Sequence, residues 1–327
     1  MAERTGWDPE MLAALERAEQ LLEPVADRNA LSIAELRMVI ERERLWWNEG
    51  APSMASVVDL TLPREGRRQL PVRLYYPTET ADPLPAILYA HGGGWVFCNL
   101  ATHDRIMRTL ARDAGAVVVG VDYALAPDHK FPTAHDDMLA ALEAVIANAG
   151  AWRLDAGRVA LAGDSAGGNL ALATAMAARD RVAGVLAFYA VADTDTSRAS
   201  YDRHGKPPNW LLAEQMPWFF DACARSPEDL ADPRLSLVNG ALAGLPPVWL
   251  GLAEFDVLID ENLDLADRLR KAGVTTECVT YDGVCHNFIQ FGRVLGKAGR
   301  AIGDAADFFR RHVAGTTAPA ERMRAPP

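Results

Sequence analysis

The stretch RVALAGDSAGGNLALATAMAA, Arg158 to Ala178, decides the fold. It begins with an apolar run typical of a buried strand, passes through Gly163-Asp164-Ser165-Ala166-Gly167, and ends in an alanine-rich segment that favours a helix. A GxSxG sequence alone is a weak signal, because glycine and serine are common residues. Between a strand and a helix it predicts a nucleophile elbow, in which a sharp turn exposes a strained serine. The stretch therefore predicts an α/β fold and a reactive serine, Ser165.

Strands alternate with helices over most of the chain from residue 55 onward. The runs expected to be strands are SVVDLTL, PVRLYY, AILYA, AVVVGV, RVALAG, AGVLAFYAV, PVWLGLA and TECVTY. Amphipathic helices are expected at residues 132–147, 166–178, 261–272 and 298–312. This alternation predicts an α/β architecture, with a mostly parallel eight-stranded sheet flanked by helices.

Two segments interrupt the alternation. Residues 1–50 are expected to form helices, because Pro9 follows the N-cap residue Asp8 and because SIAE, residues 32–35, is a capping box. More than fifty residues separate AGVLAFYAV from PVWLGLA, and this connection is first polar and then rich in aromatic residues. So long a connection usually carries function or an inserted subdomain. The Pro- and Ala-rich tail, residues 316–327, is expected to be disordered.

Composition excludes several classes of partner. Half of the 327 residues are hydrophobic and the net charge is -11, which argues against a nucleic-acid-binding surface. The N-terminus lacks the layout of a secretory signal, and the longest apolar stretch, residues 182–192, is too short to cross a bilayer. We therefore expect no membrane partner and a cytoplasmic location. The cysteines lack the spacing of a metal or redox site, so we expect buried free thiols, no metal and no cofactor: Cys98, Cys223, Cys278 and Cys285.

A reactive serine requires a base, and the base requires an acid to orient it. With this type of elbow, the acid and then the base follow the serine along the chain, each after a strand. His286 meets this condition in a short loop after TECVTY, and is preferred over His204 in the polar connection. His312 is expected inside the last helix.

The acid is expected just beyond the run PVWLGLA. Asp256 is preferred because it lies at the predicted turn from strand to helix. Asp260 is interpreted as the N-cap of the following helix, and Glu254 remains an alternative acid. Three carboxylates in this short stretch thus leave the choice of acid open to a structural test.

A glycine run, HGGGW at residues 91–95, follows the predicted strand AILYA. Stabilising a tetrahedral oxyanion requires backbone N–H donors that approach closely, and glycine permits that approach. HGGG sequences form such a loop in lipases and esterases, where the N–H of the residue after the nucleophile completes the oxyanion hole. That residue is Ala166 here.

HGGGWVF, GDSAGGNLA, AEFDVLIDEN and GVCHNF occur in this order, and the chain thereby resembles the hormone-sensitive-lipase-like (bacterial family IV) esterases of the α/β-hydrolase fold. The resemblance extends from the N-terminal helices to the last helix. It implies the triad Ser165, Asp256 and His286, and oxyanion donors at Gly93, Gly94 and Ala166. It also implies that residues 1–50, together with residues 193–235, form a helical cap over a catalytic domain of residues 51–315.

The resemblance further implies a serine esterase acting on short-to-medium-chain carboxylic esters, and it allows a homodimer. Candidate contacts to a small-molecule ester substrate are Trp46, Trp47, Trp95, Trp210, Trp218 and Asn287. The alternatives are an amidase or arylformamidase with the same triad, and a non-catalytic binding protein, which the presence of His286 disfavours. The chain departs from the family pattern at Ala124, Val257 and Asn287, where arginine, proline and glycine are usual.

Overall fold

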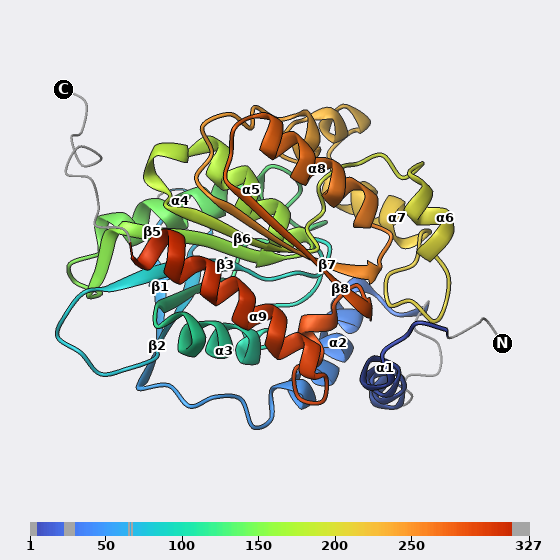
Figure 1. Cartoon of the computed structure of the whole chain (residues 1–327), viewed down its shortest axis with the longest axis horizontal. Coiled ribbons are helices and arrows are strands. Elements are labelled where there is room, and N and C mark those ends of the chain that lie inside the picture. Colours follow the sequence, from blue (N-terminus) through green and yellow to red (C-terminus); the bar gives the residue numbers. More distant parts are fainter. Residues whose placement is uncertain (1–4, 23–29, 65, 67, 316–327) are drawn as a thin grey trace.

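The computed structural model describes residues 5–22, 30–64, 66 and 68–315, and within them an eight-stranded sheet lies between helices (Figure 1). The sheet order is β1-β2-β4-β3-β5-β6-β7-β8. β1 pairs antiparallel with β2, and β2 with β4, whereas all the other pairs are parallel. The predicted fold class is confirmed. The strands are β1 (Ser56–Leu62), β2 (Leu70–Tyr76), β3 (Leu84–Ala90), β4 (Val117–Val121), β5 (Leu154–Asp164), β6 (Gly184–Phe188), β7 (Val248–Phe255) and β8 (Thr276–Cys285).

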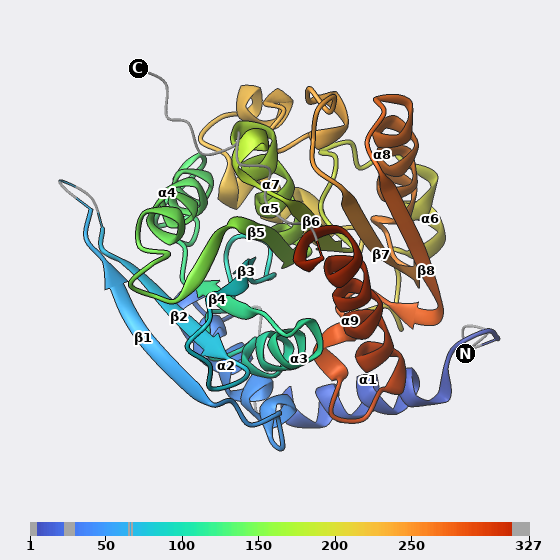
Figure 2. The same ribbon diagram turned by 60° about the vertical axis from the view of Figure 1, so that its left-hand side comes forward.

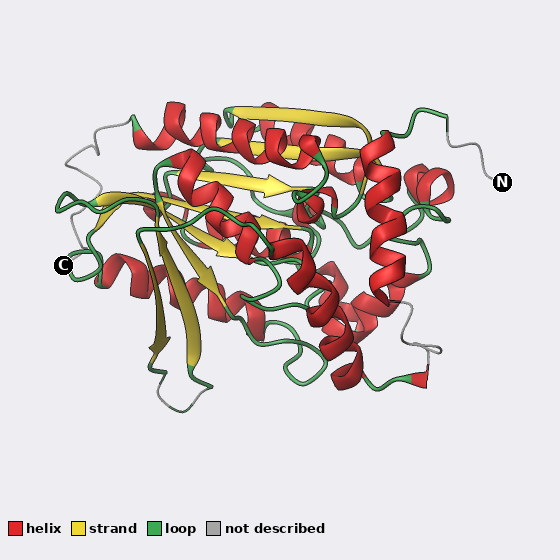
Figure 3. Ribbon diagram, turned by 90° about the horizontal axis from the view of Figure 1, so that it is seen from below, coloured by secondary structure: helices red, strands yellow, loops and turns green. Residues whose placement is uncertain are grey.

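The central strands are buried on both faces, which explains their continuous apolar sequences. Alternate residues of β3 enter different cores: Leu88 packs with one cluster, and Ile87 and Tyr89 pack with the other. Helices α4 (Thr133–Ala147), α5 (Ala166–Ala177) and α8 (Ile259–Lys271) cover the first face, and α3 (Asp104–Ala114) and α9 (Gly296–Phe309) cover the second (Figure 2). β1 is mostly exposed and projects with β2 from the rest of the sheet (Figure 3).

Four further helices lie in the right-hand half of Figure 1, toward which the arrows of β7 and β8 point. Two come from the N-terminal segment, α1 (Pro9–Leu22) and α2 (Ile33–Asn48), and two from the connection between β6 and β7, α6 (Ala199–His204) and α7 (Gln215–Cys223). The predicted capping box is present: Glu35 N–H donates to Ser32 Oγ, and Ser32 N–H donates to Glu35 Oε2. The helical character predicted for both segments is thus observed.

The structure tests the prediction for the cysteines but not the prediction for the C-terminal tail. All four cysteines are free, with three buried and Cys278 partly buried. The tail, residues 316–327, lies outside the described residues. In the part of the chain that the structure describes, no helix is both long enough and apolar enough to cross a bilayer.

Candidate active site

Ser165 lies between the end of β5 and the start of α5, as the sequence predicts for an elbow. Its backbone has φ 54° and ψ -123°, a conformation that is strained for any residue with a side chain. Phe188 at the end of β6 and Val191 just beyond it hold this backbone on both sides. Ser165 N–H donates to Phe188 O at 2.9 Å, and Ser165 O accepts from Val191 N–H at 3.1 Å. Gly167 is required in the turn, because a Cβ atom there would overlap the backbone of Ala90.

Three side chains from separate loops form one hydrogen-bonded chain. His286 Nε2 lies 2.9 Å from Ser165 Oγ, and His286 Nδ1 lies 2.7 Å from Asp256 Oδ2. Asp256 follows β7 and also accepts a hydrogen bond from Leu258 N–H at 3.0 Å. All three side chains are buried, and Ser165 retains 8% exposure. The geometry is that of a nucleophile, a base and an orienting acid.

The alternative acids have other partners. Glu254 Oε2 accepts from Gly283 N–H at 2.7 Å, and the carboxylate of Asp260 accepts from Ser200 N–H at 2.9 Å. The interpretation of Asp260 as an N-cap is wrong, because α8 begins at Ile259 and Asp260 lies in its first turn. Here Asp260 satisfies backbone and side-chain donors of the preceding connection, namely Ser200 and Arg203.

The alternative bases are likewise engaged elsewhere. The His204 ring lies 5.8 Å from the ring of Phe255, and His312 lies near Glu277 in the π-helical turn at the end of α9. Neither ring forms a hydrogen bond with Ser165 within the described ranges. Of the three histidines considered from the sequence, the structure brings His286 to the serine.

The glycine run after β3 forms a tight loop beside the elbow. Gly93 and Gly94 have φ values of +115° and +61°, which favour glycine. No acceptor for the N–H of Gly93 or Gly94 occurs among residues 5–22, 30–64, 66 and 68–315. A Cβ atom at Gly94 would overlap the ring of Phe219 from α7. The sequence marked the aromatic segment around Phe219 but gave no sign of this contact.

Asp164 ties the glycine loop to the elbow. Its Oδ1 accepts from Tyr89 Oη at 2.7 Å and from Gly92 N–H at 3.0 Å, and its Oδ2 lies 3.4 Å from His103 Nε2. Burial alone raises the pKa of Asp164, but the charge and hydrogen bond of His103 and the hydrogen bond from Tyr89 outweigh burial and lower the pKa to about 2. A charged carboxylate therefore fixes the position of the loop relative to the serine.

Asn287, next to the base, is held by the N-terminal segment. It has φ 72° and ψ 8°, a left-handed conformation that asparagine tolerates better than most residues. Arg44 Nη1 of α2 donates to Asn287 Oδ1 at 3.1 Å. Arg44 is also paired with Glu43, whose pKa is raised by burial. The sequence gave no signal for Arg44, because 243 residues separate it from its partner.

The tryptophans predicted as substrate contacts do not gather in one cluster. Trp47 and Trp210 both pack edge-on against Phe291, and Trp46 packs on Trp47. Trp95 is buried in a different place, near Phe220 of α7, and Trp218 is 42% exposed and stacks on Phe97. Their contact with a substrate stays a prediction. No group of three or more potential metal ligands occurs among the described residues.

Comparison with known proteins identifies the family. A family model described as the alpha/beta hydrolase fold matches residues 87–290. The ethyl acetate hydrolase of Pseudomonas putida is 34% identical over 317 residues, which cover 94% of this chain and 99% of that protein. The chain belongs to the α/β-hydrolase family.

Other relatives of this α/β hydrolase are esterases too. The carboxylesterase NlhH of Mycobacterium tuberculosis is 36% identical over 254 residues, which cover 76% of this chain and 80% of that protein. The solved structure of a hyperthermophilic esterase from the archaeon Pyrobaculum calidifontis superposes with a TM-score of 0.87 at 34% identity, covering 94% of this chain and 99% of that chain. These similarities confirm the predicted kinship with hormone-sensitive-lipase-like esterases, and with it the enzyme class of a carboxylic ester hydrolase.

Proposed function

We propose that this α/β hydrolase is a serine esterase that cleaves short-to-medium-chain carboxylic esters. The observation that carries the proposal is the continuous chain from Ser165 Oγ through His286 to Asp256, with distances of 2.9 and 2.7 Å. Such a chain activates a hydroxyl for attack on an acyl carbon. The esterases among its relatives support an ester, rather than another acyl compound, as the substrate.

In the first half of the reaction, Ser165 Oγ attacks the ester carbonyl carbon while His286 Nε2 takes the hydroxyl proton. Asp256 holds the Nδ1–H tautomer and stabilises the imidazolium that forms. The developing oxyanion accepts hydrogen bonds from the N–H groups of Gly93, Gly94 and Ala166. When the intermediate collapses, His286 returns the proton to the leaving alcohol and an acyl-enzyme remains.

In the second half, water attacks the acyl-enzyme and His286 again acts as the base. The tetrahedral intermediate is stabilised by the same N–H groups, and the carboxylic acid leaves as Ser165 recovers its proton. Every proton transfer uses His286 Nε2, so no metal or cofactor enters this scheme.

The substrate range follows from the elements around the site. We infer that α1, α2, α6 and α7 form a cap over a catalytic domain of residues 51–315, which limits the length of the acyl chain. Two contacts support the cap: Phe219 of α7 lies against Gly94, and Arg44 of α2 holds Asn287. A hydrolase for ethyl acetate among the relatives is compatible with a small acyl group.

A panel of p-nitrophenyl esters and p-nitroanilide amides, with wild type and Ser165→Ala, tests the proposal. We expect hydrolysis of the esters, little hydrolysis of the amides, and loss of activity in Ser165→Ala. A fluorophosphonate probe should label Ser165 alone. Faster cleavage of the amides would identify an amidase, and activity retained in Ser165→Ala would refute the catalytic role of Ser165.

A further inference from the structure

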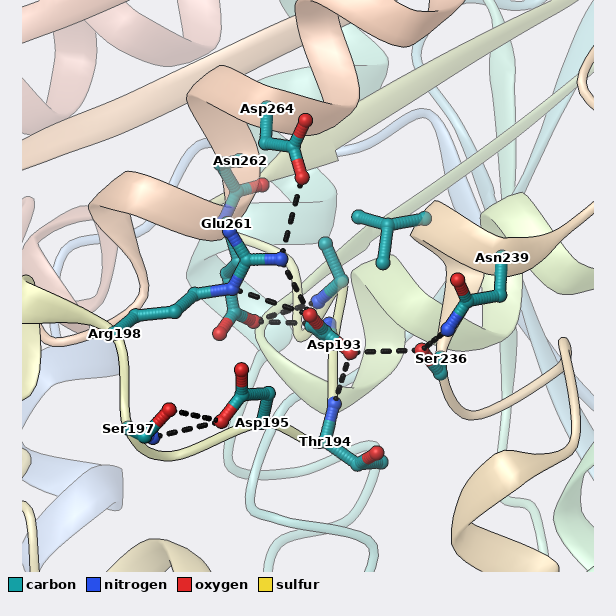
Figure 4. A network of polar contacts seen from close by, with 12 residues as sticks. Asp193, Thr194, Asp195, Ser197, Arg198, Ser236, Asn239, Glu261, Asn262 and Asp264 are labelled. Atoms are coloured by element: carbon teal, nitrogen blue, oxygen red, sulfur yellow. Dashed lines mark hydrogen bonds and ion pairs between the residues drawn. The ribbon is translucent and has the colours of Figure 1, made fainter.

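Residues 190–193, which follow β6 and are called the junction below, are held by the first turn of α8 (Figure 4). Glu261 Oε1 accepts from the N–H groups of Ala192 and Asp193 at 2.8 and 3.2 Å. The next residue, Asn262, donates from Nδ2 to Ala190 O at 2.7 Å. Two adjacent side chains of one helix therefore fix the backbone of residues 190–193.

The same short junction supports the strained nucleophile. Val191 N–H donates to Ser165 O, and Asn169 Nδ2 of α5 donates to Val191 O at 3.0 Å. Ser165 keeps its positive φ only while its surroundings enforce it, because the conformation is costly. Val191 lies between the two residues that bind α8, Ala190 and Ala192. A shift of residues 190–193 would therefore move the Val191 N–H that donates to Ser165 O.

Polar contacts around Glu261 secure both ends of the connection between β6 and β7 (Figure 4). Asp193 Oδ1 accepts from Ser236 Oγ at 2.7 Å, and Asp193 Oδ2 pairs with Arg198. Arg198 also reaches Asp264 of α8 at 3.2 Å. Thus the start of the connection, its end and α8 are joined through one carboxylate, that of Asp193.

Glu261 differs from Asp193 and Asp264 because it is wholly buried and because no cationic side chain of the described residues forms an ion pair with it. Its Oε2 has no hydrogen-bond partner among the described residues. Burial raises the pKa of Glu261 well above its usual value, although the two backbone N–H groups oppose the rise. Burying a carboxyl group with one oxygen unsatisfied is costly, so the contacts of its other oxygen need to compensate.

We propose that Glu261 is a positioning residue for the nucleophile, which acts by fixing the 190–193 junction that supports the Ser165 backbone. The inference rests on the proposed esterase function, in that it assigns Glu261 to the same site. To fix the junction, the side chain at position 261 has to reach the Ala192 and Asp193 N–H groups with an acceptor oxygen, which requires the length of a glutamate. Glutamine provides that acceptor, whereas leucine removes it and aspartate is one methylene too short.

The experiment compares Glu261→Gln, Glu261→Asp and Glu261→Leu with the wild type, measuring kcat, KM, the melting temperature and the rate of fluorophosphonate labelling. Two controls lie on the same helix. Asp264→Asn alters the polar cluster without touching residues 190–193, and Leu269→Ala destabilises the buried face of α8. We expect both controls to retain kcat within about threefold, although Leu269→Ala melts at a lower temperature.

For Glu261→Leu we expect kcat about 10- to 100-fold lower and KM nearly unchanged, because a small misplacement of a reacting group has effects of this size. The labelling rate should fall in parallel. Glu261→Gln should stay close to wild type, and Glu261→Asp should lie between glutamine and leucine. A loss of kcat in Glu261→Leu no larger than in Leu269→Ala, or no loss, would overturn the proposal.

Two features keep the experiment decisive. If Glu261→Leu does not fold, the comparison of Asp with Gln decides, and equal kcat values for the two overturn the proposal. The rate of fluorophosphonate labelling reports on the reactivity of Ser165 without an ester substrate. The effect of the Glu261 variants can therefore be measured even when the chosen ester is a poor substrate. Failure of the wild type to cleave any ester, or activity in Ser165→Ala, would instead refute the proposed function.

Discussion

Replacing Gly94 with alanine should disable the proposed oxyanion loop through a steric conflict with Phe219 of α7. Gly94 has φ +61°, and a Cβ atom would overlap three atoms of the Phe219 ring. Phe219 is partly buried and packs near Phe97, so it does not have free space on every side. We expect the glycine loop to shift, taking the N–H of Gly94 away from the oxyanion position.

Gly94→Ala should have two separable effects, one on stability and one on kcat. The left-handed conformation costs alanine about 1 to 2 kcal/mol of stability. Loss of one oxyanion donor lowers kcat by roughly 10²- to 10³-fold. In Gly94→Ala/Phe219→Ala the ring is absent, so the loop can return while the strain at residue 94 remains. We therefore expect kcat of the double variant to exceed that of Gly94→Ala by at least about tenfold. With Phe219→Ala close to wild type in kcat, this ratio is a coupling of about 1.4 kcal/mol.

The assay is kcat for p-nitrophenyl butyrate, with melting temperatures for each variant. Gly115→Ala is the matched control, because Gly115 has φ +63° at the end of α3 and a Cβ atom there meets nothing within 4 Å. It should lose stability but retain kcat. Full activity in Gly94→Ala would show that the loop is not constrained as described, and additive effects in the double variant would exclude Phe219 as the cause.

Other variants and reagents test separate parts of the site. Asp256→Asn should lower kcat about 10⁴-fold while the fold stays intact. Asp260→Asn serves as the control. A larger loss of kcat in Asp260→Asn would identify Asp260 as the catalytic acid instead. The pKa of Asp164 is about 2 in the folded protein, whereas its ordinary value, taken for the unfolded chain, is 3.8. The charged carboxylate therefore contributes about 2 kcal/mol to the free energy of unfolding above pH 3.8, and this contribution is lost as the pH falls toward 2. Acid unfolding of Asp164→Asn should lack this component, and an unchanged pH dependence of the unfolding free energy would contradict the assignment. Burial raises the pKa of Cys98 to about 11 and of Cys285 to about 12, so iodoacetamide at pH 8 should leave activity intact, and rapid inactivation with alkylation of either thiol would contradict their burial. Acetyl to hexanoyl esters should be preferred over long-chain emulsified lipid, because each methylene adds about 0.8 kcal/mol of burial only while it fits, and overpacking then costs about 1 to 3 kcal/mol. Deletion of residues 1–45 should flatten this preference, or abolish activity if the proposed cap also supports the fold. Faster hydrolysis of long-chain emulsified lipid than of p-nitrophenyl butyrate by the intact protein would refute the cap argument.

The sequence predicted the features that depend on local pattern. All eight strands, the elbow at Ser165 and the capping box at Ser32 follow from periodicity, turn chemistry and spacing within a few residues. The order of the chain limited the candidates for acid and base, and the predicted strand ends then favoured Asp256 over Glu254 and Asp260 and favoured His286 over His204. The structure places both side chains beside the serine.

The features that the sequence did not reveal depend on contacts between distant segments. The interpretation of Asp260 failed because a helix can begin before an aspartate when its first turn binds groups from another segment, here Ser200. Glu261 lies in the quoted AEFDVLIDEN motif, yet nothing in the motif shows that it reaches a junction nearly 70 residues earlier. The same applies to Phe219 and Gly94, whose contact arises only when α7 folds over the glycine loop.

The connection between β6 and β7 touches the site at two points with different consequences. Its first residues support the Ser165 backbone and are bound by Glu261, whereas α7 contacts the glycine loop through Phe219. The hydrogen bond from Ser236 to Asp193 joins the two ends of the connection before either α6 or α7 is reached. We therefore expect a change at Phe219 of α7 to alter the surroundings of Gly94 while the hydrogen bonds that Glu261 and Ser236 make with the first residues of the connection remain.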